Sequence, residues 1–416
     1  MRCRSCGTEV RSFLDLGSTP LANSFLKENQ LSTAEPSFPL EVGFCPNCTL
    51  VQLMHTVPPE QIFRDYVYVT STSSSITEHF HALARAAVER VGLTADDLVV
   101  EIGSNDGTLL RGFAPSGIRT LGIEPATNIA AIARSNGIDT VNEFFEPGIA
   151  RRVRDEHGPA SFMVGCNVVA HIPDLNGTME GVATLLADEG VFQVEAPYLL
   201  ELLDRAEFDT IYHEHFFYFS LRALEYVMER HGLRIFDVAF FPDVHGGTIR
   251  ASVCRTGAAY DRTEAAAKAF TREEEAGVAQ VATYADFAAR VTGIRERLLR
   301  LLGDLRRDGA RVAGYGAAAK GNTLLNYCGI GPQLLDYVAD KNPLKQGLYT
   351  PGMHLPVVEA ARLAKDRPDY TLILAWNMAD EIVAEQQAYR DAGGRFIVPI
   401  PDPRICESSL ARWSEA

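Results

Sequence analysis

The sequence predicts an α/β protein in which a small cysteine-rich module precedes two doubly wound, Rossmann-like sheets. Two apolar segments, Val99–Gly107 and Arg311–Gly316, each run into a glycine-rich turn and indicate the two sheets. Paired cysteines near the start indicate the module. Strand-like and helix-like segments alternate over residues 98–254 and again after residue 311, as they do in parallel sheets covered by helices.

Composition excludes several classes of protein. The 416 residues, of which 46% are hydrophobic, can form two or three buried cores. The net charge of −15 opposes a nucleic-acid-binding surface. No apolar run approaches the ~18 residues that a membrane span needs, and the chain shows no signal peptide. We therefore expect a cytoplasmic protein without nucleic-acid or membrane partners.

Two Cys-x-x-Cys pairs predict a metal site in the amino-terminal module. Cys3 and Cys6 form the first pair, and Cys45 and Cys48 form the second. Four thiolates suit a structural zinc ion, because a catalytic zinc keeps one position open. Disulfides are the alternative, but they are rare in cytosolic proteins. The gap between the pairs is long enough for a small subdomain that includes residues 13–17.

The middle region carries the pattern of a ligand-binding sheet edge. Predicted strands cover residues 98–102, 120–123, 162–166, 191–195, 234–240 and 248–253, and an amphipathic helix covers 76–91. The connector before that helix ends in serines that suit an N-cap and loop, whereas its Tyr66 and Tyr68 could face a ligand. His245 precedes two glycines, which would let the backbone approach a ligand closely.

An acid-x-Gly-x-x-x-Gly turn follows the first of these strands, and a second acid ends the next strand. Glu101 and Glu124 are the acids. A carboxylate in the position of Glu124 can accept both hydroxyls of a ribose, and ligands of open α/β sheets bind at this edge. The pattern resembles the S-adenosylmethionine (SAM) site of class I methyltransferases; the alternative is a tight turn with an incidental acid. The residues predicted to bind SAM are Glu101, Gly103, Asn105, Gly107, Glu124 and Asn167.

A run of titratable side chains, Tyr212–His215, lies among aromatic residues and suits a pocket in which burial tunes a general base. His213 and His215 would share a face if the segment were extended, so spacing alone does not choose between them. A His-x-His metal pair and a surface loop are the alternatives. His171, which follows a strand, could donate a hydrogen bond to a developing oxyanion, or it could be a helix cap or a core residue.

The carboxyl-terminal region begins with a helical stretch, residues 260–309, whose arginines are expected on a solvated face. The following Gly314-x-Gly316-x-x-Ala319 resembles a dinucleotide fingerprint, with Asp340 as a plausible ribose acid. Lys320 and Asn322 open the next helix, where free N–H groups suit a pyrophosphate. Either NAD(P) or a nucleotide-linked substrate would fit. Later strands are expected at 334–339, 370–375 and 396–398, and the domain is expected to end near Pro399.

These motifs together resemble the three-domain NDP-sugar C-methyltransferases of antibiotic deoxysugar biosynthesis, similar to nucleotide-sugar C-3 methyltransferases. The resemblance implies a zinc-binding module (residues 1–65), a SAM-dependent methyltransferase domain (66–255), and a helical connector with a nucleotide-sugar-binding Rossmann-like domain (256–416). It implies His215 as the base, beside Glu214, Tyr212 and His171. It also implies substrate contacts, which we expect from Tyr66, Tyr68, His245, Lys320 and Asn322.

The implied reaction methylates a dTDP-4-keto-6-deoxysugar at the carbon beside the ketone, through an enolate, with C3 favoured over C5. SAM is the expected methyl donor, and the zinc ion takes no part in the chemistry. The sequence leaves open a 3-amino group on the sugar and the oligomeric state. Rival interpretations are an O- or N-methyltransferase, an NAD(P)-dependent oxidoreductase built on the Gly314 turn, and a zinc-bearing interaction protein without catalytic activity.

Overall fold

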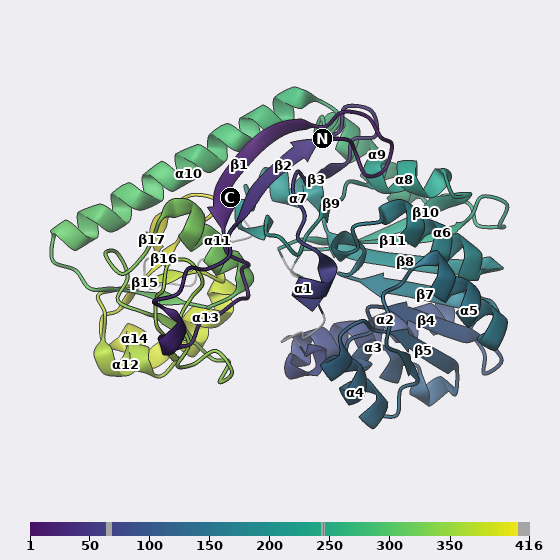
Figure 1. The fold of residues 1–416 in the computed structure, drawn as a ribbon, viewed down its shortest axis with the longest axis horizontal. Helices are drawn as coiled ribbons and strands as arrows, with labels where there is room; N and C mark the ends of the chain where they lie inside the picture. The colour runs from purple at the N-terminus through teal and green to yellow at the C-terminus, as the bar shows by residue number, and fades with distance from the viewer. Residues whose placement is uncertain (64–68, 243, 245, 407–416) are drawn as a thin grey trace.

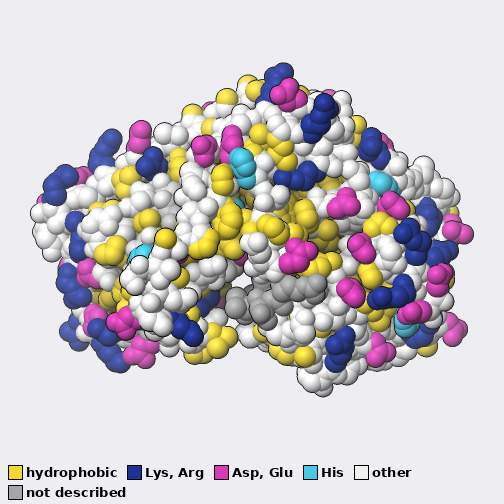
Figure 2. Space-filling model, in the orientation of Figure 1, with side chains coloured by type: hydrophobic (Ala, Val, Ile, Leu, Met, Phe, Trp, Pro, Cys, Tyr) yellow, Lys and Arg dark blue, Asp and Glu magenta, His cyan; other side chains and the backbone are white. Residues whose placement is uncertain are grey.

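The computed structural model describes residues 1–63, 69–242, 244 and 246–406. Figure 1 shows two lobes joined along one side by a long helix, α10 (Val281–Arg307), and by the curved strands β1 and β2 near the N-terminus. Figure 2 shows apolar side chains gathered at the centre of this face, between the lobes, with charged side chains toward the flanks. No helix in the described part of the chain is long and apolar enough to cross a membrane.

The first sheet joins the amino-terminal module to the middle of the chain. Its order is β1-β2-β3-β9, and all of its pairs are antiparallel. Strand β9 comes from the segment that follows His215, so the module packs directly on that segment. Residues after β1 reach the other lobe, where Leu26 pairs with Tyr349. The elements are β1 (Arg11–Thr19), η1 (Glu28–Gln30), β2 (Phe38–Phe44), β3 (Val51–Leu53), α1 (Pro59–Phe63) and β9 (Phe217–Tyr218).

The middle sheet has the order β10-β11-β8-β7-β4-β5-β6. The five strands from β8 to β6 are parallel, and β11 is antiparallel to both of its neighbours. The chain runs outward in both directions from β4 and β7, which is the switch point of a doubly wound sheet. Its strands are β4 (Leu98–Ile102), β5 (Arg119–Ile123), β6 (Thr140–Val141), β7 (Ala160–Cys166), β8 (Leu186–Pro197), β10 (Leu233–Phe241) and β11 (Thr248–Arg255).

Helices cover both faces of the middle sheet, and the fold class expected from the sequence is confirmed. The predicted helix 76–91 is α2, whose N-cap is Ser73, as the serine-rich connector indicated. The helical elements are η2 (Thr70–Thr72), α2 (Ser74–Val91), α3 (Thr108–Arg111), η3 (Ala114–Ser116), α4 (Thr127–Ser135), α5 (Pro147–His157), η4 (Val169–His171), α6 (Leu175–Leu185), α7 (Leu199–Asp204), η5 (Phe208–Thr210) and α8 (Leu221–Glu229).

The third sheet has the order β14-β13-β12-β15-β16-β17 and is parallel except for β17. It extends past Pro399 because β17 returns along β16, so the expected end of this domain was wrong. The expected strand 334–339 begins later, at Val338. The strands are β12 (Val312–Tyr315), β13 (Val338–Asp340), β14 (Val357–Glu359), β15 (Tyr370–Ile373), β16 (Arg395–Val398) and β17 (Arg404–Cys406); the helical elements are α11 (Ala319–Cys328), α12 (Arg362–Asp366), η6 (Trp376–Met378), α13 (Ala379–Glu385) and α14 (Gln387–Asp391).

Two helices, α9 (Glu264–Glu275) and α10, link the second sheet to the third. Ile294, Leu298 and Leu302 of α10 are buried at helical spacing, which confirms the predicted core face. Buried side chains from all three sheets form one continuous hydrophobic cluster. The three sheets are therefore packed against one another. This packing determines which elements lie between the two lobes.

Candidate active site

The turn after β4 brings backbone and acidic groups to the carboxyl edge of the middle sheet. Gly103 and Gly107 have φ of 65° and 77°, and a Cβ on Gly103 would lie 2.5 Å from Val168. Only glycine fits there without strain. Glu101 is buried, and its Oε2 has no hydrogen-bond partner within the described part of the chain. Burial, with the nearby Glu124 carboxylate as a second cause, raises the pKa of Glu101 well above its usual range.

Glu124 lies across this turn at the end of β5. Its Oε2 accepts from the Asn105 N–H at 2.9 Å, and its Oε1 accepts from the Ala126 N–H at 2.8 Å. Each oxygen has further lone-pair capacity for a ligand hydroxyl. Asn167, at φ 54°, has a buried Oδ1 without a partner among the described residues. These unpaired acceptors fit the ribose hydroxyls and the ammonium group of SAM, so the residues predicted to bind SAM are compatible with it.

The connector before α2 contacts the glycine turn after β4. The sequence analysis did not predict this contact. The Thr70 N–H donates to Asn105 Oδ1 at 2.9 Å, and the Ser71 N–H donates to Asp106 Oδ2 at 3.3 Å. Farther along the same edge, Glu195 forms a buried ion pair with Arg250 at 2.6 Å and contacts His79 at 2.8 Å. The sequence analysis did not identify this group either, because Glu195, Arg250 and His79 lie on three separate elements.

The segment that carries the titratable run is a turn, so the two histidines do not share a face as they would in an extended strand. The His215 N–H donates to the Tyr212 carbonyl at 2.9 Å and closes the turn. The His213 ring lies against the amino-terminal sheet, with Nε2 3.2 Å from the Phe38 carbonyl. The His215 ring lies on the other side, with Nδ1 2.8 Å from the Thr210 carbonyl. Since a carbonyl only accepts, Nδ1 carries a proton, so the neutral form of the ring has its lone pair on Nε2.

His215 belongs to a column of rings. Its centroid is 4.1 Å from that of Tyr212 and 4.9 Å from that of His171, and Phe63 stacks on His171 at 5.5 Å. Burial lowers the pKa of His171 to about 4 and raises the pKa of Tyr212 well above its usual range. Both groups are therefore neutral hydrogen-bond donors at neutral pH. Phe63, from α1, was missed because a lone aromatic residue carries no local signal.

A narrow, largely apolar cavity borders this column at the end of β8. Aliphatic and aromatic side chains form most of its wall, and His215 and Tyr218 supply its titratable groups. Exclusion of water from such a space strengthens hydrogen bonds to a developing charge. The residues that line the cavity are Ala170, Ala196, Pro197, Leu199, Leu202, Thr210, His215, Phe217, Tyr218 and Phe219.

Glu214 is held by residues from both ends of the chain. Its Oε1 accepts from Asn23 Nδ2 at 2.6 Å. Lys345 is close enough for the carboxylate to raise the lysine pKa, although burial dominates and lowers it. Asn23 was missed, because nothing in the local sequence indicates that the loop after β1 reaches the titratable run.

The glycine turn after β12 is built like the turn after β4, but it carries lysines. Gly316 has φ 93°, and Asp340 Oδ2 accepts from the Ala317 N–H at 2.6 Å. Lys345 Nζ donates to the Ala317 carbonyl at 2.7 Å. Lys320, also at this turn, forms an ion pair with Glu207 at 3.6 Å, across the lobes.

Of the five residues predicted to bind substrate, the structure describes two, Lys320 and Asn322. Asn322 is buried, and its Nδ2 donates to the Ala22 carbonyl at 2.7 Å, so this donor holds the loop after β1 against α11. Lys320 faces the middle lobe. Tyr66, Tyr68 and His245 lie outside the described residues, and their predicted contacts stay predictions.

The four predicted metal ligands lie together at the start of the chain. The Sγ atoms of Cys3, Cys6, Cys45 and Cys48 are all within 4.8 Å of one another. Sulfur atoms on a tetrahedral zinc ion are about 3.8 Å apart, given Zn–S bonds of about 2.3 Å, so the cluster fits the ion. Asn176 of α6 donates to the Arg4 carbonyl at 2.8 Å and thereby attaches the cluster to the middle lobe.

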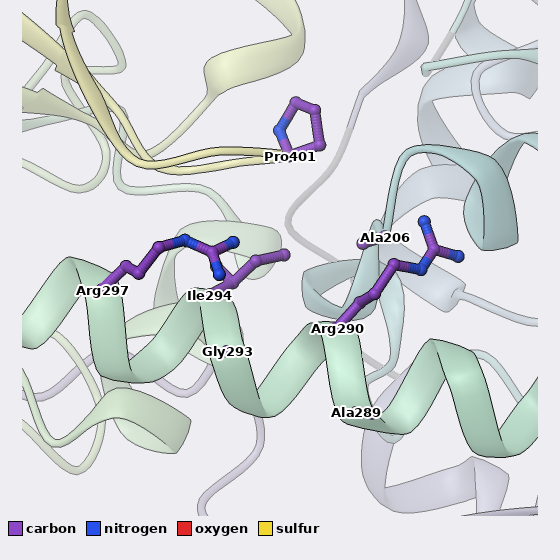
Figure 3. A pocket seen from close by; sticks show the side chains of 7 residues that line it. All are labelled: Ala206, Ala289, Arg290, Gly293, Ile294, Arg297 and Pro401. Carbon is purple, nitrogen blue, oxygen red and sulfur yellow. The ribbon is translucent and has the colours of Figure 1, made fainter.

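A second cavity, of about 330 Å³, lies along α10 (Figure 3). Arg290 and Arg297 project from the helix toward it, and Pro401 lies opposite. Both arginines have partners: Arg290 binds the Leu203 carbonyl, and Arg297 binds Asp402. The ring column is not among the residues that line this cavity, so we do not assign it to the active site.

Comparisons with known proteins agree with this arrangement. Family models match successive parts of the chain: a zinc binding domain at residues 3–63, a methyltransferase domain at 76–238, and a C-methyltransferase C-terminal domain at 243–401. C-methyltransferase NovU from Streptomyces niveus is 42% identical over 413 residues, which are 98% of this chain and 98% of NovU.

Solved structures match a smaller part of the chain. Magnesium protoporphyrin IX methyltransferase (ChlM) from Synechocystis PCC 6803 is 13% identical, with a TM-score of 0.35, over 43% of this chain and 83% of its own. The PH0226 protein from Pyrococcus horikoshii OT3 is 14% identical, with a TM-score of 0.37, over 47% of this chain and 97% of its own. Because these matches cover less than half of the chain, the fold class rests on the strand order described above.

Proposed function

Since this chain belongs to the C-methyltransferase family and is SAM-dependent, we propose that its substrate is a dTDP-4-keto-6-deoxysugar, methylated at a carbon beside the ketone. The observation that carries the proposal is the position of His215: its Nδ1 proton is fixed by Thr210, and its ring contacts the rings of two neutral donors, Tyr212 and His171. A carbon acid beside a ketone needs such a base and such donors. An O- or N-methyltransferase deprotonates no carbon acid and forms no enolate that would need these donors.

In the proposed reaction His215 Nε2 removes the proton from the carbon beside the ketone. Tyr212 and His171, both neutral, donate hydrogen bonds to the enolate oxygen, and each such donor is worth on the order of 3 kcal/mol. The carbanion then takes the methyl group, which SAM supplies when bound at Glu101 and Glu124. Lys320, near the Gly316 turn, supports binding of the diphosphate of a nucleotide-linked substrate.

The sequence analysis favours C3 as the methylated carbon, with C5 as the alternative. Incubation of a panel of dTDP-4-keto sugars with SAM, followed by mass spectrometry and NMR of the products, tests both the substrate and the position. Solvent deuterium should enter the carbon that is later methylated, even without SAM. A product methylated on oxygen or nitrogen, or absence of deuterium exchange with every sugar of the panel, contradicts the proposal.

We further propose that the four cysteines bind one structural zinc ion. The support is the compact set of four sulfur atoms, which leaves no position open for a substrate. Metal analysis of the purified protein should find one zinc per chain, and a Cys45→Ser/Cys48→Ser variant should have lost it. Unchanged zinc content in the variant contradicts this assignment.

A further inference from the structure

One short turn connects His215 to the carboxyl-terminal lobe, which is the lobe that contains the third sheet. The turn is η5 (Phe208–Thr210), and Thr210, its last residue, supplies the carbonyl that accepts the His215 Nδ1 proton at 2.8 Å. The Thr210 N–H donates to the Glu207 carbonyl at 3.1 Å, which fixes the conformation of the turn. Any displacement of η5 therefore moves the acceptor that selects the tautomer of His215.

Side chains of the other lobe hold this turn. Trp376 of η6 donates its indole N–H to Asp209 Oδ2 at 2.7 Å. Tyr327 of α11 packs edge-on against Phe208, with ring centroids 5.3 Å apart. The carboxyl-terminal lobe thus contacts η5 through Asp209 and Phe208, whereas Thr210 of the same turn contacts His215.

The Asp209–Trp376 hydrogen bond is the strongest of these contacts. Asp209 is completely buried, and its other oxygen, Oδ1, has no partner among the described residues. Burial raises the pKa of this carboxyl group, whereas the charge of Lys320 and, after it, the hydrogen bond from the Trp376 indole lower that pKa and so stabilise the carboxylate. A hydrogen bond to a carboxylate in a site without water is stronger than one between neutral groups.

We propose that Asp209 and Trp376 are positioning residues through which the carboxyl-terminal lobe holds His215 in the tautomer that leaves Nε2 as the base. This inference rests on the proposed function in taking His215 as the base. It assigns to the third domain a part in proton abstraction, in addition to the binding of substrate. Neither residue touches the reacting atoms; both act through Thr210.

Trp376→Phe tests the proposal, because it keeps a ring at η6 and removes the indole donor. We expect kcat to fall roughly tenfold to a hundredfold, as when a reacting group is slightly misplaced, while KM and the affinity for SAM stay unchanged. The ¹⁵N NMR spectrum of histidine-labelled protein should show a loss of the single Nδ1–H tautomer at His215, identified by comparison with His215→Ala. Asp209→Asn, whose carboxamide oxygen still accepts from the indole, should retain the tautomer and most of kcat.

Two further variants keep the test decisive. Asp209→Leu/Trp376→Phe removes both polar partners, so it should fold even if Trp376→Phe does not, and it should still lose the tautomer. Tyr389→Phe is the matched control, because it removes a buried hydrogen bond to the Arg395 carbonyl in the same lobe without touching η5. An unchanged His215 tautomer and kcat in both Trp376 variants overturn the inference. The NMR measurement needs no substrate, so a wild-type protein that methylates no keto sugar would refute only the proposed function.

Discussion

The turns after β4 and β12 have the same construction and opposite electrostatics. In each, a glycine at positive φ follows a parallel strand, and the acid that ends the next strand accepts backbone N–H groups: Glu124 in the first and Asp340 in the second. The first turn has Glu101 beside it, whose Oε2 has no partner among the described residues, whereas the second has Lys345 and Lys320. The same backbone arrangement therefore occurs at both turns, and the neighbouring side chains differ: the first turn offers oxygen acceptors to the ammonium and hydroxyl groups of a ligand, and the second offers ammonium groups to an anion.

The largest effect should come from His215, the proposed base. His215→Ala should lower methyl transfer and solvent-deuterium exchange by roughly 10²- to 10⁴-fold, because a general base is lost, while SAM binding survives. His213→Ala is the control, since its ring faces Phe38 instead of the cavity. If exchange disappears in His213→Ala and persists in His215→Ala, the base is His213.

His171 should make folding stability depend on pH. The unfolded chain binds a proton at this histidine near pH 6.5, whereas the folded protein binds it only near pH 4. The contribution of His171 to the free energy of unfolding is thus fully present above pH 6.5 and is lost as the pH falls toward 4. Between pH 8 and pH 5 the free energy of unfolding should fall by about 2 kcal/mol because of this residue. Urea unfolding of wild type and His171→Gln at both pH values isolates this difference. An identical pH dependence in the two proteins contradicts the predicted burial of a neutral ring.

The two strand-end acids should differ in their effect on SAM. Glu124→Ala removes two charge-assisted hydrogen bonds to the ribose, so SAM affinity should fall by roughly tenfold or more. Asp340→Ala makes the equivalent change at the other turn and should leave SAM affinity as in wild type. Calorimetry measures the affinity for SAM in both variants. Equal losses in the two variants would mean that the turn after β4 does not select the ligand.

The smallest effect should be at the lysines of the second turn. Lys320→Met should weaken binding of dTDP about fivefold, since one phosphate contact near a protein surface contributes on the order of 1 kcal/mol. Lys320→Arg keeps the charge and should bind dTDP nearly as wild type does. Titration with dTDP, in parallel with SAM, checks this. Unchanged dTDP binding in Lys320→Met would move the diphosphate away from this turn.

Most of the fold was predictable because its signals are local. The strand at 98–102 was correct to the residue, and its glycine turn required the positive φ that the structure shows. The four cysteines were identified from spacing alone, since each pair needs one tight turn. The end of the third sheet was misjudged because β17 is short and gains its stability from pairing with β16.

The site was only partly predictable. The residue types around Tyr212–His215 indicated a base in a buried pocket, but spacing did not choose between the two histidines, and the turn sends their rings in different directions. The contacts that orient these residues come from Asn23 and Trp376, each more than one hundred and fifty positions away. A local sequence pattern does not predict contacts between residues so far apart in the chain.

The sequence by itself determined the sheet class, the four cysteines that could hold a metal ion and the candidate SAM-binding turn, because each depends on residues a few positions apart whose backbone requirements are strict. Only the tertiary structure decided which histidine faces the cavity, why His171 is neutral, and how the carboxyl-terminal lobe contacts the turn that holds His215. Those properties depend on burial and on hydrogen bonds between distant segments, and both arise only when the three sheets pack into one core.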